Sequence, residues 1–373
     1  MVATVWLDAN ENPFTWPEHV LAQAWETLRA GGTHRYPRDG QALRRALAEY
    51  AGVPPEWVLP GNGSDELIIA LLSSLGRRVG RVILPWPTFT FYRRVATALD
   101  LSVVLVGLDA DFSLSAADLG RALRSEREAL VVLCRPNNPT GNLFPRDVVL
   151  AALEWGAWVV VDEAYFEFSG ETVCDLLARH RRLVVLRTLS KAFALAALRV
   201  GYALAHPDTL AVLRSLMQPY SVDAFSRAAA LVALEHADLT REWVRALCAC
   251  REELRRDLAE VPGLRPYPSR ANFLLVEVLP EEGRGGTARQ AGSGAACGPR
   301  GSGAGDRRPG AEVAAMLAAE GVRVRCWPEE PRLRDFFRVS VGLPRENAAL
   351  VEALRRSLAR GEAGGELTCG ARG

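Results

Sequence analysis

Short apolar segments alternate with helical segments through the first half of the chain, and this alternation strongly limits the possible folds. The apolar segments lie at 81–85, 101–108, 129–134, 157–162 and 183–188, and the helical segments between them lie at 90–100, 115–125, 145–156 and 173–180. Strands this apolar are covered on both faces, and strands joined by helical crossovers run parallel. The sequence therefore predicts an α/β fold whose large domain has a mostly parallel sheet sandwiched by helices.

The other segments predict the domain organisation. Residues 1–30 are expected to form an N-terminal arm that belongs in part to a small domain, and residues 31–260 form the large domain. A small α+β domain is expected over 261–360. Residues 283–310 contain ten glycines and almost no bulky apolar side chain, so we expect a disordered insertion there and a disordered tail at 361–373. Further helices are expected at 17–29, 40–52, 222–259, 310–321 and 345–360, and further strands at 272–278, 322–327 and 336–342.

The composition argues against several classes of partner. The net charge is +1 over 373 residues, so no basic excess indicates binding to nucleic acid. Seven cysteines show neither a disulfide framework nor zinc-ligand spacing, which favours a reducing, cytoplasmic setting without a metal site. The N-terminus lacks the features of a signal peptide, and no apolar run reaches the length of a membrane span. We therefore expect a cytoplasmic protein that binds small molecules and neither nucleic acid nor membrane.

Lysine occurs at a single position. The chain has 45 lysine and arginine residues, and Lys191 in "TLSKAFALAALRVGY" is the only lysine among them. Arginine stays protonated in proteins, whereas a lysine can lose its proton and condense with a carbonyl group to form a Schiff base. Two interpretations compete: a solvated lysine left in an arginine-biased sequence, or an amine required for chemistry. The choice between them depends on residues elsewhere in the chain.

Polar residues follow three consecutive predicted strands. The segment "RPNNPTG" follows 129–134, "DEAY" ends 157–162, and "LSK" follows 183–188. In open parallel sheets, ligands bind beyond the carboxyl ends of the strands, so we expect these segments at one edge. The segment "GNGSDE" at 61–66 opens a helix with small residues, which leaves backbone N–H groups free for an anion such as phosphate. Each segment alone also suits a turn, a strand end or a helix cap.

Together these groups match the requirements of pyridoxal phosphate. The aldehyde of the cofactor needs an amine, which Lys191 supplies. The ring nitrogen needs a carboxylate, here Asp162, that keeps the ring protonated as an electron sink. Donors near the ring hydroxyl and an anion site for the phosphate complete the set. The joint pattern therefore predicts one pocket for this cofactor.

Eight motifs resemble, in the same order, those of the fold-type I pyridoxal-phosphate aminotransferases, and within them the histidinol-phosphate aminotransferases. They are "LDANENPF", "RYPRDG", "GNGSDELI", "PWPTFTFYR", "RPNNPTG", "VVVDEAYFEF", "TLSKAFALAALRVGY" and "FFRVSVG". They span nearly the whole chain apart from the insertion and the tail. The resemblance implies a fold-type I pyridoxal-phosphate transferase with a large and a small domain.

The resemblance implies catalytic roles for Lys191, Asp162 and Tyr165. Lys191 is similar to the Schiff-base lysine that also moves a proton between the substrate Cα and the cofactor. Asp162 would pair with the ring nitrogen, and Tyr165 would contact the ring hydroxyl group together with Asn138. The remaining implied cofactor-binding residues are Phe89, stacked on the ring, and a phosphate cradle of Gly63, Ser64, Asp65, Ser190 and Arg199, in which Asp65 caps its helix.

Substrate contacts and a second subunit are also implied by the resemblance. Arg338 is similar to the arginine that holds the α-carboxylate of glutamate, a task that suits its planar guanidinium group. Arg325 and the segment 10–12, including Asn12, lie where the family contacts the substrate side chain, although Arg325 also suits a solvated edge strand. Tyr36 resembles the residue that reaches the phosphate of the neighbouring subunit, which implies a homodimer.

The expected activity is transamination between histidinol phosphate and 2-oxoglutarate, with imidazole acetol phosphate and glutamate as products, in histidine biosynthesis. Three alternatives stay open: a lyase similar to threonine-phosphate decarboxylase, an aromatic amino acid aminotransferase, and a non-catalytic protein of this fold. Two features depart from the family pattern. Ala197 stands where relatives often have glycine, and the insertion at 283–310 lengthens the small domain.

Overall fold

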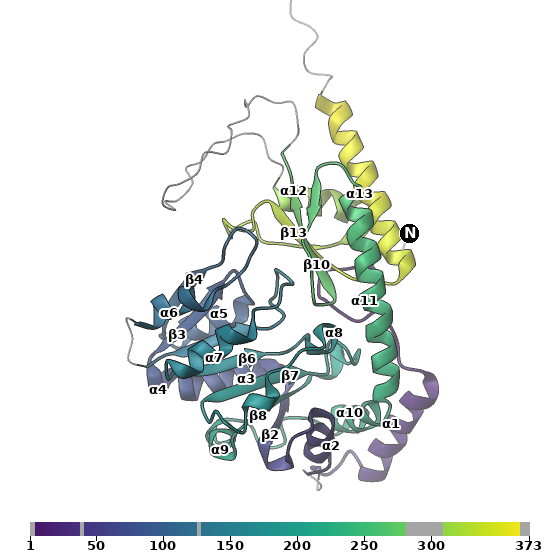
Figure 1. The fold of residues 1–373 in the computed structure, drawn as a ribbon. Helices are drawn as coiled ribbons and strands as arrows, with labels where there is room; N and C mark the ends of the chain where they lie inside the picture. Colours follow the sequence, from purple (N-terminus) through teal and green to yellow (C-terminus); the bar gives the residue numbers. More distant parts are fainter. Residues whose placement is uncertain (1–3, 38–40, 125–127, 281–308, 366–373) are drawn as a thin grey trace, which may run out of the picture.

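The computed structural model describes residues 4–37, 41–124, 128–280 and 309–365 (Figure 1). The predicted insertion at 283–310 therefore lies outside the described residues apart from its last two positions, and the predicted tail does so beyond Gly365. Within the described ranges, none of the helices has the length and apolar character needed to cross a membrane.

A seven-stranded sheet forms the larger layer, with strand order β2-β8-β7-β6-β5-β3-β4 (Figure 1). Neighbouring strands from β4 to β7 run parallel, whereas β8 pairs antiparallel with both β7 and β2. The prediction of a mostly parallel sheet is confirmed. The strands are β2 (Val58–Asn62), β3 (Arg81–Trp86), β4 (Ser102–Gly107), β5 (Leu130–Cys134), β6 (Trp158–Asp162), β7 (Leu183–Thr188) and β8 (Val200–Ala205).

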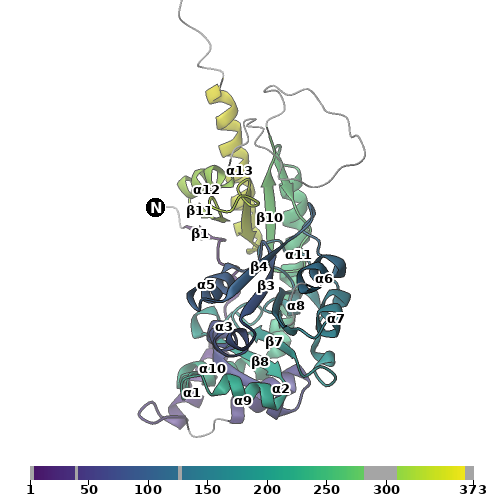
Figure 2. The same ribbon diagram turned by 90° about the vertical axis from the view of Figure 1, so that its left-hand side faces the viewer.

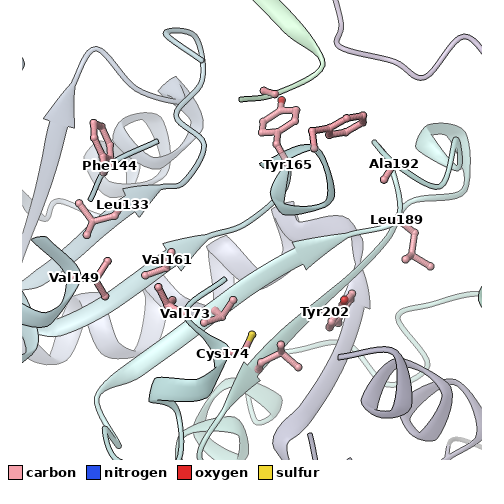
Figure 3. Packing of buried hydrophobic residues seen from close by; sticks show 14 of the residues in the cluster. Leu133, Phe144, Val149, Val161, Tyr165, Val173, Cys174, Leu189, Ala192 and Tyr202 are labelled. Atoms are coloured by element: carbon pink, nitrogen blue, oxygen red, sulfur yellow. The ribbon is translucent and has the colours of Figure 1, made fainter. Parts of the chain in front are cut away.

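Helices cover both faces of this sheet, because successive strand residues point to opposite faces. On β5, Val131 and Leu133 belong to one buried cluster, whereas Leu130 and Val132 belong to another. Figure 3 shows part of the first cluster, in which Leu133 and Val161 lie near Phe144 and Val149. The first cluster packs against α2 (Gln41–Ala51), α6 (Ala116–Arg124), α7 (Arg146–Glu154) and α10 (Ala224–Glu235), and the second against α3 (Gly63–Leu71), α5 (Thr90–Ala98) and α9 (Pro207–Arg214).

A smaller layer contains the C-terminal residues and the N-terminal strand. Its antiparallel sheet has the order β12-β13-β10-β9, and β1 pairs in parallel with β11. The long helix α11 (Ala237–Ala259) runs alongside both layers (Figures 1 and 2). The other elements are β1 (Val5–Trp6), β9 (Leu264–Pro266), β10 (Phe273–Val278), β11 (Val322–Arg323), β12 (Arg325–Cys326), β13 (Phe336–Ser340), α12 (Gly310–Ala319) and α13 (Pro344–Gly365). Helix α1 (Glu18–Gly31) packs against α10. The domain boundaries at residues 30, 260 and 360 stay a prediction.

The sequence pattern did not reveal β2 and β8. Strand β8 carries Gly201, Ala203 and Ala205, small residues with a weak preference for strands, and β2 contains a proline and a glycine. Both strands form because tertiary packing is close there. A Cβ atom at Gly201 would lie 2.4 Å from the Ser64 nitrogen, so the start of α3 approaches β8 with no room for a side chain.

Three predicted helices differ from the structure. The helix expected at 173–180 is only a 3₁₀ turn at Cys174–Leu176, where the N–H groups of Leu176 and Leu177 donate three residues back, to the carbonyls of Val173 and Cys174. The helix expected at 222–259 is divided at His236 into α10 and α11. Helix α13 continues to Gly365, beyond the expected end at 360. Short helical turns complete the fold at Pro55–Trp57, Leu72–Gly76, Arg77–Val79, Phe166–Ser169 and Ala196–Leu198.

Two residues between β12 and β13 connect the small layer to the large sheet. Trp86, at the end of β3, donates from Nε1 to Glu330 Oε2 at 2.8 Å. Arg332 donates from Nη1 to the Trp86 carbonyl at 3.2 Å, and from Nη2 to the carbonyls of Leu108 and Asp109. We call Trp86, Glu330 and Arg332 the clasp. It fixes the segment that follows β12 against the edge of the large sheet.

Loss of the clasp should weaken the fold. Arg332→Met removes a charged donor from backbone carbonyls, and we expect the free energy of unfolding to fall by about 1–3 kcal/mol. Urea denaturation followed by circular dichroism measures the change. The matched control is Arg334→Met at an exposed position, where we expect a change within about 0.5 kcal/mol. Equal stability of the two variants would contradict the role of the clasp.

Candidate active site

The carboxyl ends of β5, β6 and β7 meet at one edge of the large sheet, and a cavity of about 590 Å³ lies beyond them. The cavity also reaches the start of α3, residues 8–11, and the strands β12 and β13. The predicted site residues that line it are Ser64, Asp65, Phe89, Asn138, Asp162, Tyr165, Ser190, Lys191, Arg199, Arg325 and Arg338. Groups from distant parts of the chain thus share one cavity.

Lys191 is half-buried directly after β7, and its Nζ donates to the Ala9 carbonyl at 2.8 Å. Burial and the positive charge of Arg338 lower the pKa of Lys191 to about 8, although Glu11 opposes the shift. An ordinary lysine is almost wholly protonated at neutral pH, whereas a pKa near 8 leaves a substantial fraction as the neutral amine. This amine is therefore suited to act as a nucleophile and as a base.

Asp162 ends β6, and its side chain is buried at the base of the cavity wall. Its Oδ2 accepts the hydroxyl of Tyr92 at 2.7 Å, and its Oδ1 accepts the N–H of Ala164 at 3.1 Å. Burial raises the pKa of Asp162 to about 6, and the two hydrogen bonds oppose that rise. The carboxyl group is therefore mostly ionised at neutral pH and able to stabilise a cation in the cavity.

Tyr165, Asn138 and Phe89 provide contacts for a planar ring. The Tyr165 hydroxyl accepts from Asn10 Nδ2 at 3.0 Å, and burial raises the pKa of Tyr165 to about 12, so it keeps its proton. Asn138 Oδ1 accepts from Arg338 Nη1 at 2.6 Å. The half-buried Phe89 presents an aromatic ring to the cavity. A flat ligand with a hydroxyl group would meet both polar donors and a stacking surface here.

The start of α3 and Arg199 form a potential anion site. Ser64 and Asp65 lie in the first turn of α3 and line the cavity. Arg199 donates from Nη2 to Asp65 Oδ2 at 2.8 Å. Gly63 has φ +69°, and a Cβ atom there would lie 2.7 Å from Arg199 Nη2. A helix N-terminus with a guanidinium group beside it suits a phosphate.

Asp65 does not cap α3 as the sequence indicated. The N–H of Asn62, at the helix start, donates to Glu66 Oε2 at 2.6 Å, and no side chain of the N-cap residue bonds to the helix. Asp65 instead pairs with Arg199 and orients that guanidinium group beside the first turn.

Two arginines occupy the side of the cavity formed by the small sheet. Arg325 and Arg338 are direct partners in the antiparallel register of β12 and β13. Arg338 is buried, and its Nη2 donates to the Asp8 carbonyl while its Nε has no hydrogen-bond partner among the described residues. Burial lowers the pKa of Arg338 to about 10, and Arg325 adds to the shift. Within the described residues no carboxylate forms an ion pair with Arg338, which favours an anionic ligand beside it.

Three predicted residues do not line the cavity. Gly63 is in close contact with Arg199 but is not part of the cavity wall. Asn12 donates from Nδ2 to the Ala192 carbonyl at 2.8 Å, so it anchors the segment next to Lys191. Tyr36 is 74% exposed and stacks on Tyr220 with ring centroids 4.5 Å apart. Ala197, the departure from the family pattern, does line the cavity.

Residues at the site that were not predicted include Tyr92, Thr88, Cys134 and Trp327. Tyr92 and Thr88 both belong to the "PWPTFTFYR" motif, which pointed to this segment without identifying them. Trp327 lies two residues after Arg325, a spacing that places both on one side of an extended chain. The alternation of strand residues could therefore have indicated Trp327, whereas nothing local indicated the contact between Tyr92 and Asp162.

The sheet order, the lysine after β7 and the aspartate at the end of β6 define this chain as an α/β protein with a cavity at the carboxyl edge of a mostly parallel sheet. The family model described as aminotransferase class I and II matches residues 3–354. The chain therefore belongs to the class I and II aminotransferase family.

Individual relatives and solved structures agree with this assignment. A histidinol-phosphate aminotransferase of Desulfitobacterium hafniense is 37% identical over 355 residues, which cover 93% of this chain and 90% of that protein. The structure of histidinol-phosphate aminotransferase from Sinorhizobium meliloti in complex with pyridoxal-5'-phosphate gives a TM-score of 0.79 at 24% identity, covering 96% of this chain and 91% of that chain. The structure of L-threonine-O-3-phosphate decarboxylase from Porphyromonas gingivalis gives a TM-score of 0.77 at 22% identity, covering 95% of this chain and 99% of that chain. The two structural likenesses concern the fold.

The lowered pKa of Lys191 can be measured directly, because no other side chain carries an amine. We expect trinitrobenzenesulfonate to modify Lys191 in the cofactor-free protein with half-maximal rate near pH 8, the pKa that burial and Arg338 produce. Arg338→Gln should move the midpoint to higher pH because a positive neighbour is lost. Peptide mass spectrometry separates this reaction from that of the N-terminal amine.

Arg325→Gln is the matched control, because Arg325 lines the same cavity but is not among the charges that shift the pKa of Lys191. It should leave the midpoint unchanged. A wild-type midpoint near 10.5, the ordinary value for lysine, would show that the cavity does not lower the pKa of the amine.

Proposed function

We propose that this chain is a pyridoxal-phosphate-dependent aminotransferase that converts histidinol phosphate and 2-oxoglutarate to imidazole acetol phosphate and glutamate, a step of histidine biosynthesis. The observation that carries the chemistry is one cavity that contains a partly neutral lysine, a buried carboxylate and a buried arginine without an acidic partner among the described residues. The substrate is supported by the printed name of the relative that shares 37% identity with this chain.

The residues present fit the cofactor. The first turn of α3 and the Arg199 guanidinium group beside it suit the phosphate, and Gly63 permits this close approach, because a Cβ atom there would lie 2.7 Å from Arg199 Nη2. Asp162 would pair with the ring nitrogen, Phe89 would stack on the ring, and Asn138 and Tyr165 would bind its hydroxyl group. When bound, pyridoxal phosphate supplies an electron-withdrawing ring that stabilises negative charge at the substrate Cα.

Lys191 performs two tasks in this proposal. Its neutral amine holds the cofactor aldehyde covalently until the amino substrate takes its place. Once released, Nζ would accept the proton from the substrate Cα and pass it to the cofactor carbon that had carried the aldehyde oxygen. A pKa near 8 suits both tasks. At neutral pH part of the amine is unprotonated, and the amine is still a strong enough base to accept the Cα proton. Activity should therefore decline as the pH falls well below 8.

Arg338 and Arg325 would bind the anionic ends of the substrates. The free Nε of Arg338 and its lack of an acidic partner in the described part of the chain suit the α-carboxylate of glutamate or 2-oxoglutarate. Arg325 is exposed and directly opposite Arg338 in the sheet, so it can meet the side-chain carboxylate of glutamate or the phosphate of histidinol phosphate.

An absorbance titration tests the substrate. We expect histidinol phosphate to abolish the absorbance band of the lysine-bound cofactor in purified protein, because the amino substrate displaces Lys191. Phenylalanine and threonine phosphate should have much smaller effects at the same concentration. Release of carbon dioxide from threonine phosphate would instead support the lyase, and an equal response to phenylalanine would support an aromatic aminotransferase. If the protein shows no absorbance band of bound cofactor after incubation with pyridoxal phosphate, the proposal that it is a pyridoxal-phosphate-dependent enzyme fails.

We also propose that the chain forms a cytoplasmic homodimer in which Tyr36 reaches the phosphate site of the partner. Tyr36 is exposed and does not line the cavity of its own subunit, so a role in binding requires another copy. The five cysteines in the described part of the chain are unpaired, which supports a reducing compartment. The exposed apolar side chains that a second subunit would cover include Tyr220, Phe225 and Leu216.

Subunit complementation tests the dimer. Lys191→Arg should fold and show no turnover, and Tyr36→Ala should bind the cofactor poorly. Mixed and refolded together, the two variants should regain activity, because a heterodimer has one site with Lys191 from one chain and Tyr36 from the other. Up to about a quarter of wild-type activity is expected when half of the dimers are mixed and each has one intact site. Absence of any recovery, with mixed dimers detected by native mass spectrometry, would place Tyr36 outside the partner's site.

A further inference from the structure

The carboxylate of Asp162 has a buried partner that does not touch the cavity. Tyr92 lies on α5, is 1% exposed, and is absent from the cavity wall. Its hydroxyl group donates to Asp162 Oδ2 at 2.7 Å, and within the described residues it is the one side chain that bonds to this carboxylate. Tyr92 therefore cannot contact a ligand, but it contacts the group that the ligand meets.

We propose that Tyr92 is a positioning residue, whose hydroxyl group keeps Asp162 ionised and orients it toward the ring nitrogen of pyridoxal phosphate. The inference rests on the proposed function, because only a cofactor with a basic ring nitrogen needs this carboxylate. A buried carboxylate is costly unless donors satisfy it. Here Tyr92 satisfies Oδ2 and the backbone of Ala164 satisfies Oδ1, so each oxygen has one donor.

Other charges near Asp162 do not replace this donor. Asp65 and Glu163 both disfavour its ionisation, and Cys134 of β5 and Tyr165 are further titratable neighbours. Each acid already has its own cation: Asp65 pairs with Arg199 at 2.8 Å, and Glu163 pairs with Arg187 at 2.9 Å. The surroundings therefore favour a protonated Asp162, and the Tyr92 hydroxyl is the side-chain group that opposes this.

Tyr92 is suited to remain a donor. Burial raises its pKa well above the ordinary value for tyrosine, so the hydroxyl keeps its proton throughout the working pH range. The ring edge of Tyr92 also packs against Phe89, with centroids 6.1 Å apart and planes at 83°. Phenylalanine at this position would keep that ring contact and remove only the hydroxyl group. Tyr92→Phe is therefore a specific test of the hydrogen bond.

The pH dependence of cofactor affinity measures the effect. We expect the affinity of cofactor-free wild-type protein for pyridoxal phosphate to fall as the pH drops through about 6, where Asp162 becomes protonated. We call this fall in affinity the acidic limb of the pH curve. In Tyr92→Phe the acidic limb should lie about one pH unit higher, because a hydrogen bond to a charged group is lost. The cofactor's own ionisations are common to both proteins, so the displacement reports on the protein. Tryptophan fluorescence at each pH gives the dissociation constants.

Tyr202→Phe is the matched control. Tyr202 is an equally buried tyrosine on β8, and its hydroxyl makes no hydrogen bond to Asp162. Its variant should keep the wild-type limb. A Tyr92→Phe limb at the wild-type pH, or a uniform loss of affinity at every pH, would overturn the inference and leave Tyr92 a packing residue.

A cofactor analogue with carbon in place of the ring nitrogen provides the second measurement. Tyr92→Phe should bind this analogue no more weakly than the wild-type protein does, since Asp162 then has no ring cation to pair with. Weaker binding of the analogue by the variant would again indicate packing alone. Borohydride reduction and mass spectrometry of the Lys191 peptide check the proposed function separately. If wild-type protein carries no fixed cofactor there, the proposed function fails; if it does and the limb does not move, only this inference fails.

Discussion

The parallel pairing of β5, β6 and β7 is the constraint on which the site depends. Parallel neighbours end at the same edge, so Asp162 at the end of β6 and Lys191 after β7 are brought to one cavity by the sheet itself. The buried apolar residues on both faces hold that edge rigid. The antiparallel strand β8 then returns the chain beside β7 and delivers Arg199 to the start of α3. The chemistry of the cavity is in this sense a consequence of strand direction.

The charges of the cavity are arranged so that its two key groups deviate from their ordinary behaviour in opposite directions. Burial disfavours charge on both Lys191 and Asp162, which lowers one pKa to about 8 and raises the other to about 6. Arg338 adds to the shift of Lys191, whereas the Tyr92 hydroxyl restrains that of Asp162. At neutral pH the site therefore offers a partly neutral base and a largely ionised carboxylate, the combination that transamination requires.

Sequence reasoning succeeded where the signal was local and strong. The apolar runs of β5, β6 and β7 could only be buried strands, and the single lysine and the residues that follow each strand indicated the cavity. It failed where tertiary contacts override local preference: β8 is built of small residues that pack closely against α3. The bond from Tyr92 to Asp162 joins residues 70 positions apart, and neither periodicity nor composition predicts such a contact. The pairing of Asp65 with Arg199 was missed for the same reason.

The amino-terminal segment supplies acceptors to both cationic groups of the cavity. The Ala9 carbonyl accepts from Lys191 Nζ, and the Asp8 carbonyl accepts from Arg338. A ligand that takes over these two donors leaves both carbonyl groups without their partners. The segment is also held through Asn10, whose N–H donates to Ser340 Oγ at 2.8 Å and whose carbonyl accepts from Asn272 at 3.0 Å. On the other side, the Leu7 N–H donates to the Arg323 carbonyl at 2.9 Å and the Leu7 carbonyl accepts from the Ser340 N–H at 2.8 Å. Occupancy of the cavity would therefore leave the carbonyl groups of residues 8 and 9 unpaired between two anchored neighbours.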